Sequence, residues 1–245
     1  MGFDQLSDID RVNGIFALIF ITISIIIGFR ILLKYITLKR KELFTIGLAW
    51  IFLSSAWWGG AASFLWMIFT DERLSLIPFL IMSNMFIPIA LICWIYSVVH
   101  IFYTESEKII TFLVIIVCAI YDLLILVFLF IDTDLVGHIE GDINAVPTLF
   151  PLIFQIGAIL TALITGSLFS IKSIKIDDPE VKLKGKILLI GFISFSFAAF
   201  MDAIIADITV FLIITRIILI SSSIEYYIGF FLPKILANKV NKVKN

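Results

Sequence analysis

The feature that most constrains this chain is a series of apolar runs, each long enough to cross a lipid bilayer. A membrane-spanning helix needs about 20 mostly apolar residues. The last apolar stretch fits two spans, and we place its turn at 205–208 because Asp207 is the strong polar residue near its middle. The sequence therefore predicts seven spans, at residues 12–36, 43–69, 76–102, 109–131, 146–171, 187–205 and 208–232.

The amino-acid composition also indicates an integral membrane protein. Hydrophobic residues make up 61% of the 245 residues and charged residues only 15%, whereas soluble domains carry about 25% charged residues. This excludes a disordered chain, a disulfide scaffold and a nucleic-acid-binding protein. No alternating barrel pattern is present, and helices satisfy their own backbone in lipid. We therefore predict an all-α polytopic membrane protein, a single seven-helix domain covering residues 1–245.

The placement of basic residues predicts an orientation. Cytoplasmic loops carry an excess of Lys and Arg. Fifteen of the 18 basic residues fall on one side of the seven spans, within residues 30–41, 108, 172–186 and 234–244, and the other side has only Arg11 and Arg73. The expected arrangement has the N-terminus outside and the C-terminus in the cytoplasm, as in a multi-pass protein of the cell membrane.

The longest outer connection, residues 132–145, is acidic. It holds four carboxylates and His138 but no Lys or Arg. Acidic loops can bind calcium, yet the spacing does not match an EF-hand. We interpret this segment as a solvated loop, with a calcium loop as the alternative.

Three ionisable residues share one predicted depth in the bilayer. Asp122, Asp202 and Arg216 lie 13, 15 and 16 residues from the inner ends of their spans, which is about 20–24 Å along a helix. Because Asp202 and Arg216 are on consecutive helices, we predict an ion pair between them, shared with Asp122. The pair either fixes the register of the helices or forms part of a site for a polar ligand or ion.

Other polar residues in the spans add to the candidate site. Asn84 and Gln155 could join the buried polar network, and Pro88 could free a backbone carbonyl for a ligand or water. Nearer the inner end, Arg30 and Glu225 share a level and predict a second pair. In the alternative, Arg30 extends to the lipid headgroups.

No enzyme signature is present. The chain has no HExxH, GxSxG or P-loop motif and no cluster of metal ligands. The two cysteines, Cys93 and Cys118, lie in apolar runs and are expected to be buried free thiols. No lysine lies between Lys186 and Lys234 to hold retinal as a Schiff base. We therefore expect a non-enzymatic protein without cofactor or metal.

Two stretches carry a family resemblance. One is Pro88-Ile89-Ala90-Leu91 with Trp94 and Tyr96; the other comprises residues 178–186 together with residues 216–233. On these stretches the chain resembles uncharacterised seven-helix membrane proteins of archaea, particularly those of the Asgard group. It is also similar to the seven-helix sensor regions that precede histidine kinase modules in microbes. The resemblance implies a sensing role and supplies no catalytic residues.

Three functions are consistent with these patterns. The first is a receptor or sensor module that signals through cytoplasmic contacts, with the lipid bilayer, a signalling protein or a second copy of the chain as partners and no nucleic acid. The second is a small transporter or channel that uses the level of Asp122, Asp202 and Arg216. The third is a structural subunit of a membrane complex. For the sensor, we expect at most a shallow cleft at the outer end, because the inner half of most helices is bulky.

Overall fold

The chain folds as a helical bundle. The structure is a computed structural model that describes residues 2–204 and 209–233. Within these residues seven helices are long and apolar enough to cross a membrane, as predicted: Asp8–Leu38, Lys41–Thr70, Leu76–Phe102, Glu107–Ile131, Leu149–Ile174, Pro179–Ile204 and Val210–Phe230. The predicted turn at 205–208 lies outside the described residues.

The first span begins earlier than the apolar run indicates. A short helix α1 (Gly2–Gln5) precedes α2 (Asp8–Leu38). The Ser7 Oγ accepts a hydrogen bond from the backbone N–H of Asp10 and donates one to the Asp10 carboxylate, which satisfies one of the free backbone donors of the first turn. Because of this cap, the polar residues from Asp8 to Asn13 are helical and belong to the bundle.

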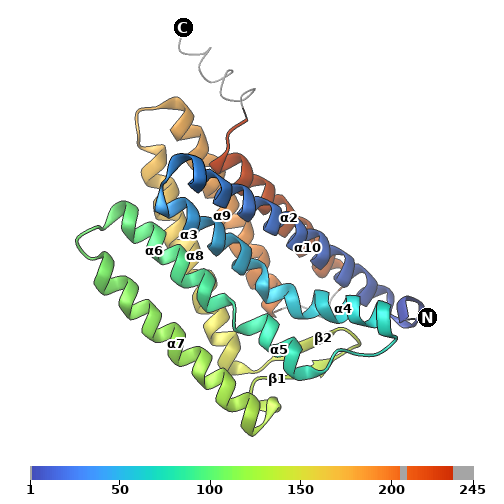
Figure 1. The fold of residues 1–245 in the computed structure, drawn as a ribbon. Helices are drawn as coiled ribbons and strands as arrows, with labels where there is room; N and C mark the ends of the chain where they lie inside the picture. Colours follow the sequence, from blue (N-terminus) through green and yellow to red (C-terminus); the bar gives the residue numbers. More distant parts are fainter. Residues whose placement is uncertain (1, 205–208, 234–245) are drawn as a thin grey trace.

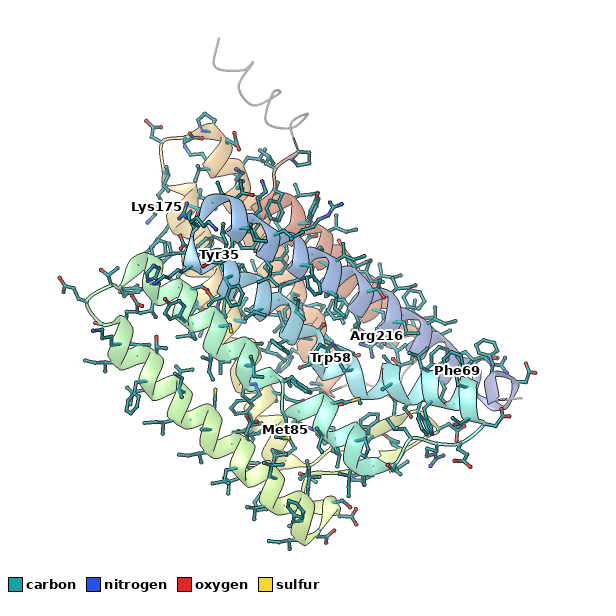
Figure 2. All side chains as sticks on the ribbon, viewed as in Figure 1. Tyr35, Trp58, Phe69, Met85, Lys175 and Arg216 are labelled. Carbon is teal, nitrogen blue, oxygen red and sulfur yellow. The ribbon has the colours of Figure 1, made fainter. Side chains whose placement is uncertain are left out.

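The second and third spans are each built from two helices. In the second, α3 (Lys41–Leu53) passes through the 3₁₀ segment η1 (Ser54–Trp57) into α4 (Trp58–Thr70). In the third, α5 (Leu76–Asn84) ends just before α6 (Ile87–Phe102). Pro88 lies in the first turn of α6, and its ring leaves no room for the carbonyl of residue 84 in a continuous helix. Met85 marks this break in Figure 2.

The remaining spans are single helices. They are α7 (Glu107–Ile131), α8 (Leu149–Ile174), α9 (Pro179–Ile204) and α10 (Thr209–Phe230). In Figure 1, α2 and α10 run side by side along one edge of the bundle, and α7 forms the opposite edge. Helix α9 packs between α8 and α10, and α3 packs between α2 and α6.

The backbone of residues 132–145 is not a solvated loop. After η2 (Thr133–Leu135), the strands β1 (Gly137–Glu140) and β2 (Asn144–Pro147) form an antiparallel hairpin. Val136 and Ile143 are 0% and 1% exposed, so apolar burial holds the acidic segment against the helices. The prediction of a solvated loop is therefore right for the acidic side chains of Asp132, Asp134 and Glu140, which are exposed, and wrong for the backbone, which forms a hairpin anchored by two buried side chains. The fifth helix accordingly begins at Leu149 and not at residue 146.

The two ends of the bundle differ in charge. The hairpin lies at the same end as the N-terminus (Figure 1), and we call this the hairpin end. The α8–α9 connection lies at the opposite end, the loop end. Figure 2 shows Phe69 at the former and Lys175 at the latter. Acidic residues gather at the hairpin end, and basic residues occur in both the α2–α3 and the α8–α9 connections at the loop end.

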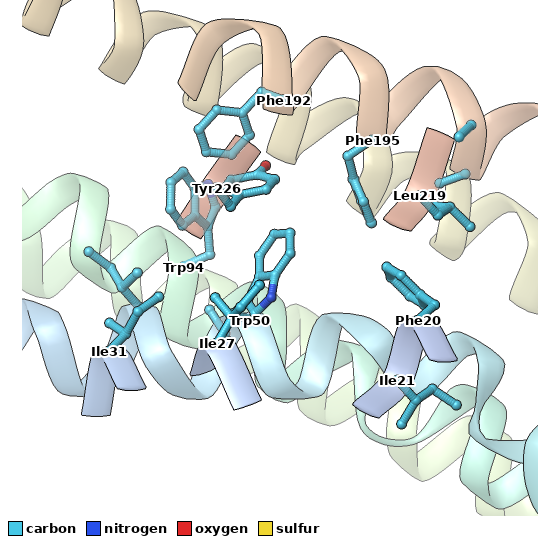
Figure 3. Close-up of a cluster of buried hydrophobic side chains, with 14 of the residues drawn as sticks. Phe20, Ile21, Ile27, Ile31, Trp50, Trp94, Phe192, Phe195, Leu219 and Tyr226 are labelled. Carbon is cyan, nitrogen blue, oxygen red and sulfur yellow. The ribbon is translucent and has the colours of Figure 1, made fainter. Parts of the chain in front are cut away.

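Large aromatic side chains fill the middle of the bundle. Figure 3 shows Trp50, Trp94, Phe192, Phe195 and Tyr226 meeting between α3, α6, α9 and α10. The ring centroids of Trp50 and Tyr226 are 3.9 Å apart, and those of Trp94 and Phe192 are 5.0 Å apart. We call these five residues the aromatic layer. They close the interior between the hairpin end and the loop end.

Candidate functional site

A cavity of about 540 Å³ lies under the hairpin. Its lining comes from α2, η1, α5, α8, α9, α10 and the hairpin, and it extends from the exposed Glu140 to the buried Arg216. Small-molecule sites typically have about 300–1,000 Å³. We call it the hairpin-end cavity. It is deeper than the shallow cleft expected from the sequence, and residues at both helix breaks, such as Trp57 and Asn84, line it.

Arg216 on α10 lies on one wall of the cavity. Its side chain is buried, and Figure 2 places it in the middle of the helical region beside α2. The Arg216 Nη1 donates to the Asp202 Oδ2 at 2.9 Å. The predicted ion pair between α9 and α10 is therefore present. Pairing is what makes two charges tolerable in so apolar a surrounding.

Two further residues complete the environment of this pair. The Asn13 Oδ1 accepts hydrogen bonds from Arg216 Nε at 3.2 Å and from Nη2 at 2.7 Å. The indole Nε1 of Trp57 donates to the Asp202 Oδ2 at 2.7 Å. Asn13, Trp57, Asp202 and Arg216 form what we call the arginine network. It ties α2, η1, α9 and α10 together at one level.

Sequence reasoning missed Asn13 and the hydrogen bond from Trp57 to Asp202, although it named Trp57 as a residue that could line a ligand cleft. Asn13 precedes the main apolar run and looks like part of a polar N-terminal segment, but the Ser7 cap brings it inside α2. The available signal was the spacing of Ser7 and Asp10, which matches a capping box. Trp57 gives no comparable signal, because a tryptophan in a span is ordinarily apolar packing. Its indole N–H acquires a partner only through the turn that η1 makes.

The opposite wall carries a second polar group. The Asn84 Oδ1 accepts hydrogen bonds from Gln155 Nε2 at 3.1 Å and from the Tyr121 hydroxyl at 3.3 Å. The Asn84 Nδ2 donates to the Leu80 carbonyl at 2.8 Å. The two candidates Asn84 and Gln155 therefore meet across α5 and α8, and both line the cavity.

The hairpin is bonded directly to the arginine network. The Asn13 Nδ2 donates to the Asn144 Oδ1 at 3.0 Å. At the hairpin turn, Arg73 Nη2 donates to Asp142 Oδ1 at 2.7 Å, which links the turn to the α4–α5 connection. Any molecule that enters the cavity beneath the hairpin would contact groups that also hold the hairpin in place.

Asp122 does not take part in this site. It is on α7, which packs mainly on α6, and it does not line the cavity. Its Oδ1 is buried without a hydrogen-bond partner among the described residues. The prediction that Asp122 shares the ion pair is wrong, because equal depth says nothing about which helices are neighbours.

The predicted pair of Arg30 and Glu225 is also wrong. Arg30 Nη1 donates to the Tyr227 hydroxyl at 2.6 Å, and its guanidinium lies 5.3 Å from the centre of that ring. Glu225 accepts hydrogen bonds from Ser194 at 2.7 Å and from Ser221 at 3.0 Å. Positions 225 and 227 are about 200° apart on a helix. The face of α10 that meets α2 therefore presents Tyr227, while Glu225 faces α9.

The cavity does not continue to the loop end within the described residues. Beyond Phe195 the aromatic layer fills the interior, leaving a void of only about 40 Å³ that borders Trp50, Trp94, Phe192 and Tyr226. In residues 2–204 and 209–233 there is also no group of three or more His, Cys, Asp or Glu side chains that could hold a metal ion. The hairpin-end cavity is therefore a pocket with mixed polar and apolar walls that stops at the aromatic layer.

Comparison with known proteins gave no further guide to this site. The chain matches no protein-family model, and no curated protein matches it significantly. The resemblance to archaeal and kinase-linked membrane proteins therefore stays a prediction. The described residues form seven helices of membrane-spanning length and apolarity, with a pocket at one end.

Proposed function

We propose that this protein is a non-enzymatic membrane receptor that binds a small molecule in the hairpin-end cavity. One observation carries the proposal. A cavity of ligand size reaches from the surface to the buried arginine network and is closed beyond it by the aromatic layer. Pockets that combine apolar walls with a few fixed polar groups are the usual form of small-molecule sites.

Charge supports an orientation for this receptor. The loop end carries most of the described basic residues, and the hairpin end is acidic. By the positive-inside rule, the loop end faces the cytoplasm and the cavity opens to the outside of the cell membrane. A cytoplasmic signalling protein or a second copy of the chain would then read the loop end.

Helix packing offers a route from the cavity to the loop end. The arginine network joins α2, η1, α9 and α10, and the last two continue past the aromatic layer. A ligand shifts an equilibrium only by binding its two states unequally. A molecule that competes for hydrogen bonds with Asn13 or Asp202 would bind two helix arrangements unequally, because those side chains also hold α2, α9 and α10 together.

Binding is the first test. The protein is placed in phosphatidylcholine nanodiscs, and its thermal unfolding is followed against a panel of small amines, acids, alcohols and sugars. At least one compound should raise the melting temperature in the native chain and fail to do so in Ala56→Phe, which fills the cavity. The control Gly157→Ala, at a site with nothing within 4 Å, should keep the effect. A panel without a hit, or hits that persist in Ala56→Phe, would contradict the proposal.

Signalling is the second test. The hit compound should change hydrogen exchange in the α8–α9 connection at the loop end, residues 175–178. A structural subunit would bind without that change. An unchanged exchange pattern at the loop end would therefore leave a binding protein but rule out a receptor.

A transporter is the second candidate function. The two broken spans support it, since η1 and the α5–α6 break both border the cavity, and transporters commonly bind substrate at discontinuous helices. Proteoliposomes loaded with the hit compound separate the two functions. Flux that is lost in Asp202→Asn would favour the transporter, and binding without flux would favour the receptor.

A further inference from the structure

The charges that line the hairpin-end cavity are unbalanced. The described lining residues include three carboxylates, Asp10, Glu140 and Asp202, but one cationic group, Arg216. Arg216 and Asp202 neutralise each other at 2.9 Å. The cavity therefore keeps two carboxylates, both towards its mouth, that no described lining cation offsets.

Of these two carboxylates, Asp10 is the stronger indication of a cationic ligand, because it is buried. It is only 7% exposed and lies beneath the hairpin turn, where its Oδ1 is 3.6 Å from the position a Cβ would take on Gly141. Among the described residues, its carboxylate accepts a side-chain hydrogen bond from Ser7 alone. A buried carboxylate normally has a cationic partner, and Asp10 has none among the described residues.

Apart from Arg216, the two described basic side chains at the hairpin end, Arg11 and Arg73, are already engaged elsewhere. Arg11, beside Asp10, bonds to Asp8 and to the backbone carbonyls of Phe3 and Asp4. Arg73 is paired with Asp142 on the hairpin. Neither lines the cavity. A cation that reaches Asp10 would therefore come with the ligand.

The rest of the cavity suits an apolar body attached to that cation. The rings of Phe79, Trp57 and Phe195 line it, and aromatic faces attract cations as well as apolar groups. Ser83 also lines the cavity, but its hydroxyl is buried against Gly59 of α4 and offers the ligand no hydrogen bond.

We infer that the ligand is a small organic ammonium ion with an apolar or aromatic body, and that Asp10, assisted by Glu140, is its counter-ion. This rests on the proposed function, because it names the chemical class that the cavity takes. The ammonium group lies beneath the hairpin turn, and the apolar body extends between Trp57 and Phe79 towards Phe195. The arginine network forms the polar end of the pocket.

The test compares three probes of nearly the same size and different charge. They are 2-phenylethylammonium, neutral 2-phenylethanol and anionic 3-phenylpropionate, titrated calorimetrically into the protein in phosphatidylcholine nanodiscs, with empty nanodiscs as the blank. The ammonium probe should bind at least about tenfold more tightly than the other two. Asp10→Asn should remove that preference, since Asn keeps an acceptor for Ser7 and preserves the helix cap. Asp8→Asn, at an exposed position two residues away, should retain it.

The outcomes separate the ligand class from the function. If the neutral or anionic probe binds as tightly and its binding is lost in Ala56→Phe, the cavity is a binding site but the inference about charge is overturned. If the ammonium probe does not bind, or binds equally well to Asp10→Asn of unchanged melting temperature, the inference is likewise overturned. If the probes bind and every one of them still binds to Ala56→Phe, they do not bind in the cavity, and both the inference and the proposed function are overturned.

Discussion

Arg216 shows how a single charge is accommodated in an apolar bundle. Its guanidinium has a carboxylate on one side and an amide oxygen on the other, from Asp202 and Asn13. Trp57 in turn donates to the same carboxylate oxygen. Each partner comes from a different helical segment, so the site requires four segments to be packed correctly. A residue with this many distant partners should be costly to replace.

The first prediction concerns the ion pair. Arg216→Met leaves Asp202 with only the Trp57 indole, and an uncompensated buried charge costs about 3–5 kcal/mol of unfolding free energy. Unfolding in mixed detergent–dodecyl sulfate micelles measures it. The control Lys184→Met breaks the partly exposed pair with Glu180 and should cost less than about 0.5 kcal/mol. Adding Asp202→Leu to Arg216→Met should restore part of the loss; no recovery would contradict a direct pair.

The second prediction concerns Asp122, which the structure leaves out of the site. Its Oδ1 has no partner among the described residues, and a polar group buried without a partner costs about 1–3 kcal/mol. Asp122→Leu should therefore raise the unfolding free energy by about 1 kcal/mol in the same micelles. Ligand binding in nanodiscs should be unchanged. Lower stability, or loss of binding, would mean that Asp122 has a partner in the working protein.

At the scale of elements, close helix contacts depend on glycine. A Cβ on Gly28 of α2 would lie 2.8 Å from the carbonyl oxygen of Gly47 on α3, and the reverse contact is the same. The two backbones approach so closely that no side chain fits between them. Small residues allow this approach in membrane bundles. The pairing of α2 with α3 therefore depends on two specific positions.

The third prediction tests that contact with a matched pair of variants. Gly28→Ala must push backbone apart, so it should lower the unfolding free energy by about 1–3 kcal/mol. Gly157→Ala on α8 meets nothing within 4 Å and should raise it by up to about 1 kcal/mol, because alanine favours the helix. Thermal unfolding of both in nanodiscs gives the comparison. Equal shifts in the two variants would disprove the close approach.

The hairpin is the other element whose anchorage can be tested. Ile143 is 1% exposed, whereas Ile139 on the neighbouring strand is 41% exposed. Ile143→Ala removes an apolar anchor worth about 2–4 kcal/mol and should speed hydrogen exchange of the amides in residues 137–147. Ile139→Ala on the same hairpin should leave that exchange unchanged. Rapid exchange in the native chain would show that the hairpin does not cover the cavity.

At the scale of the whole molecule, charge and cavity lie at defined ends. The cavity and the acidic hairpin are at one end, the basic connections are at the other, and the aromatic layer lies between them. A bundle of this form offers one chemical surface to each side of a membrane. Its orientation then decides to which side of the membrane the cavity opens.

The fifth prediction is that orientation. Glu140→Cys on the hairpin and Asp177→Cys in the α8–α9 connection are both exposed positions. In intact cells an impermeant maleimide should label Glu140→Cys at once and Asp177→Cys only after the cells are opened, because basic segments stay in the cytoplasm. The native chain, with Cys93 and Cys118 inside the bundle, is the unlabelled control. Labelling of Asp177→Cys from outside would reverse the orientation and the side from which ligand enters.

Length and apolarity were enough to predict seven helices of membrane-spanning length, because these two properties decide whether a helix can cross a bilayer and need no tertiary contacts. The sequence also identified Asp202 and Arg216 as partners, since consecutive antiparallel helices are neighbours and equal depth then implies contact. The meeting of Asn84 with Gln155, the exclusion of Asp122 and the separation of Arg30 from Glu225 were decided only by the tertiary structure. Each of these three outcomes depends on which non-consecutive helices are in contact and on how far each helix is rotated about its own axis. The hydropathy of a span does not reveal that rotation, because it is nearly the same in every orientation. The cavity is bordered by two helix breaks and by the hairpin. The position of the hairpin depends on the burial of Val136 and Ile143, which is a tertiary contact.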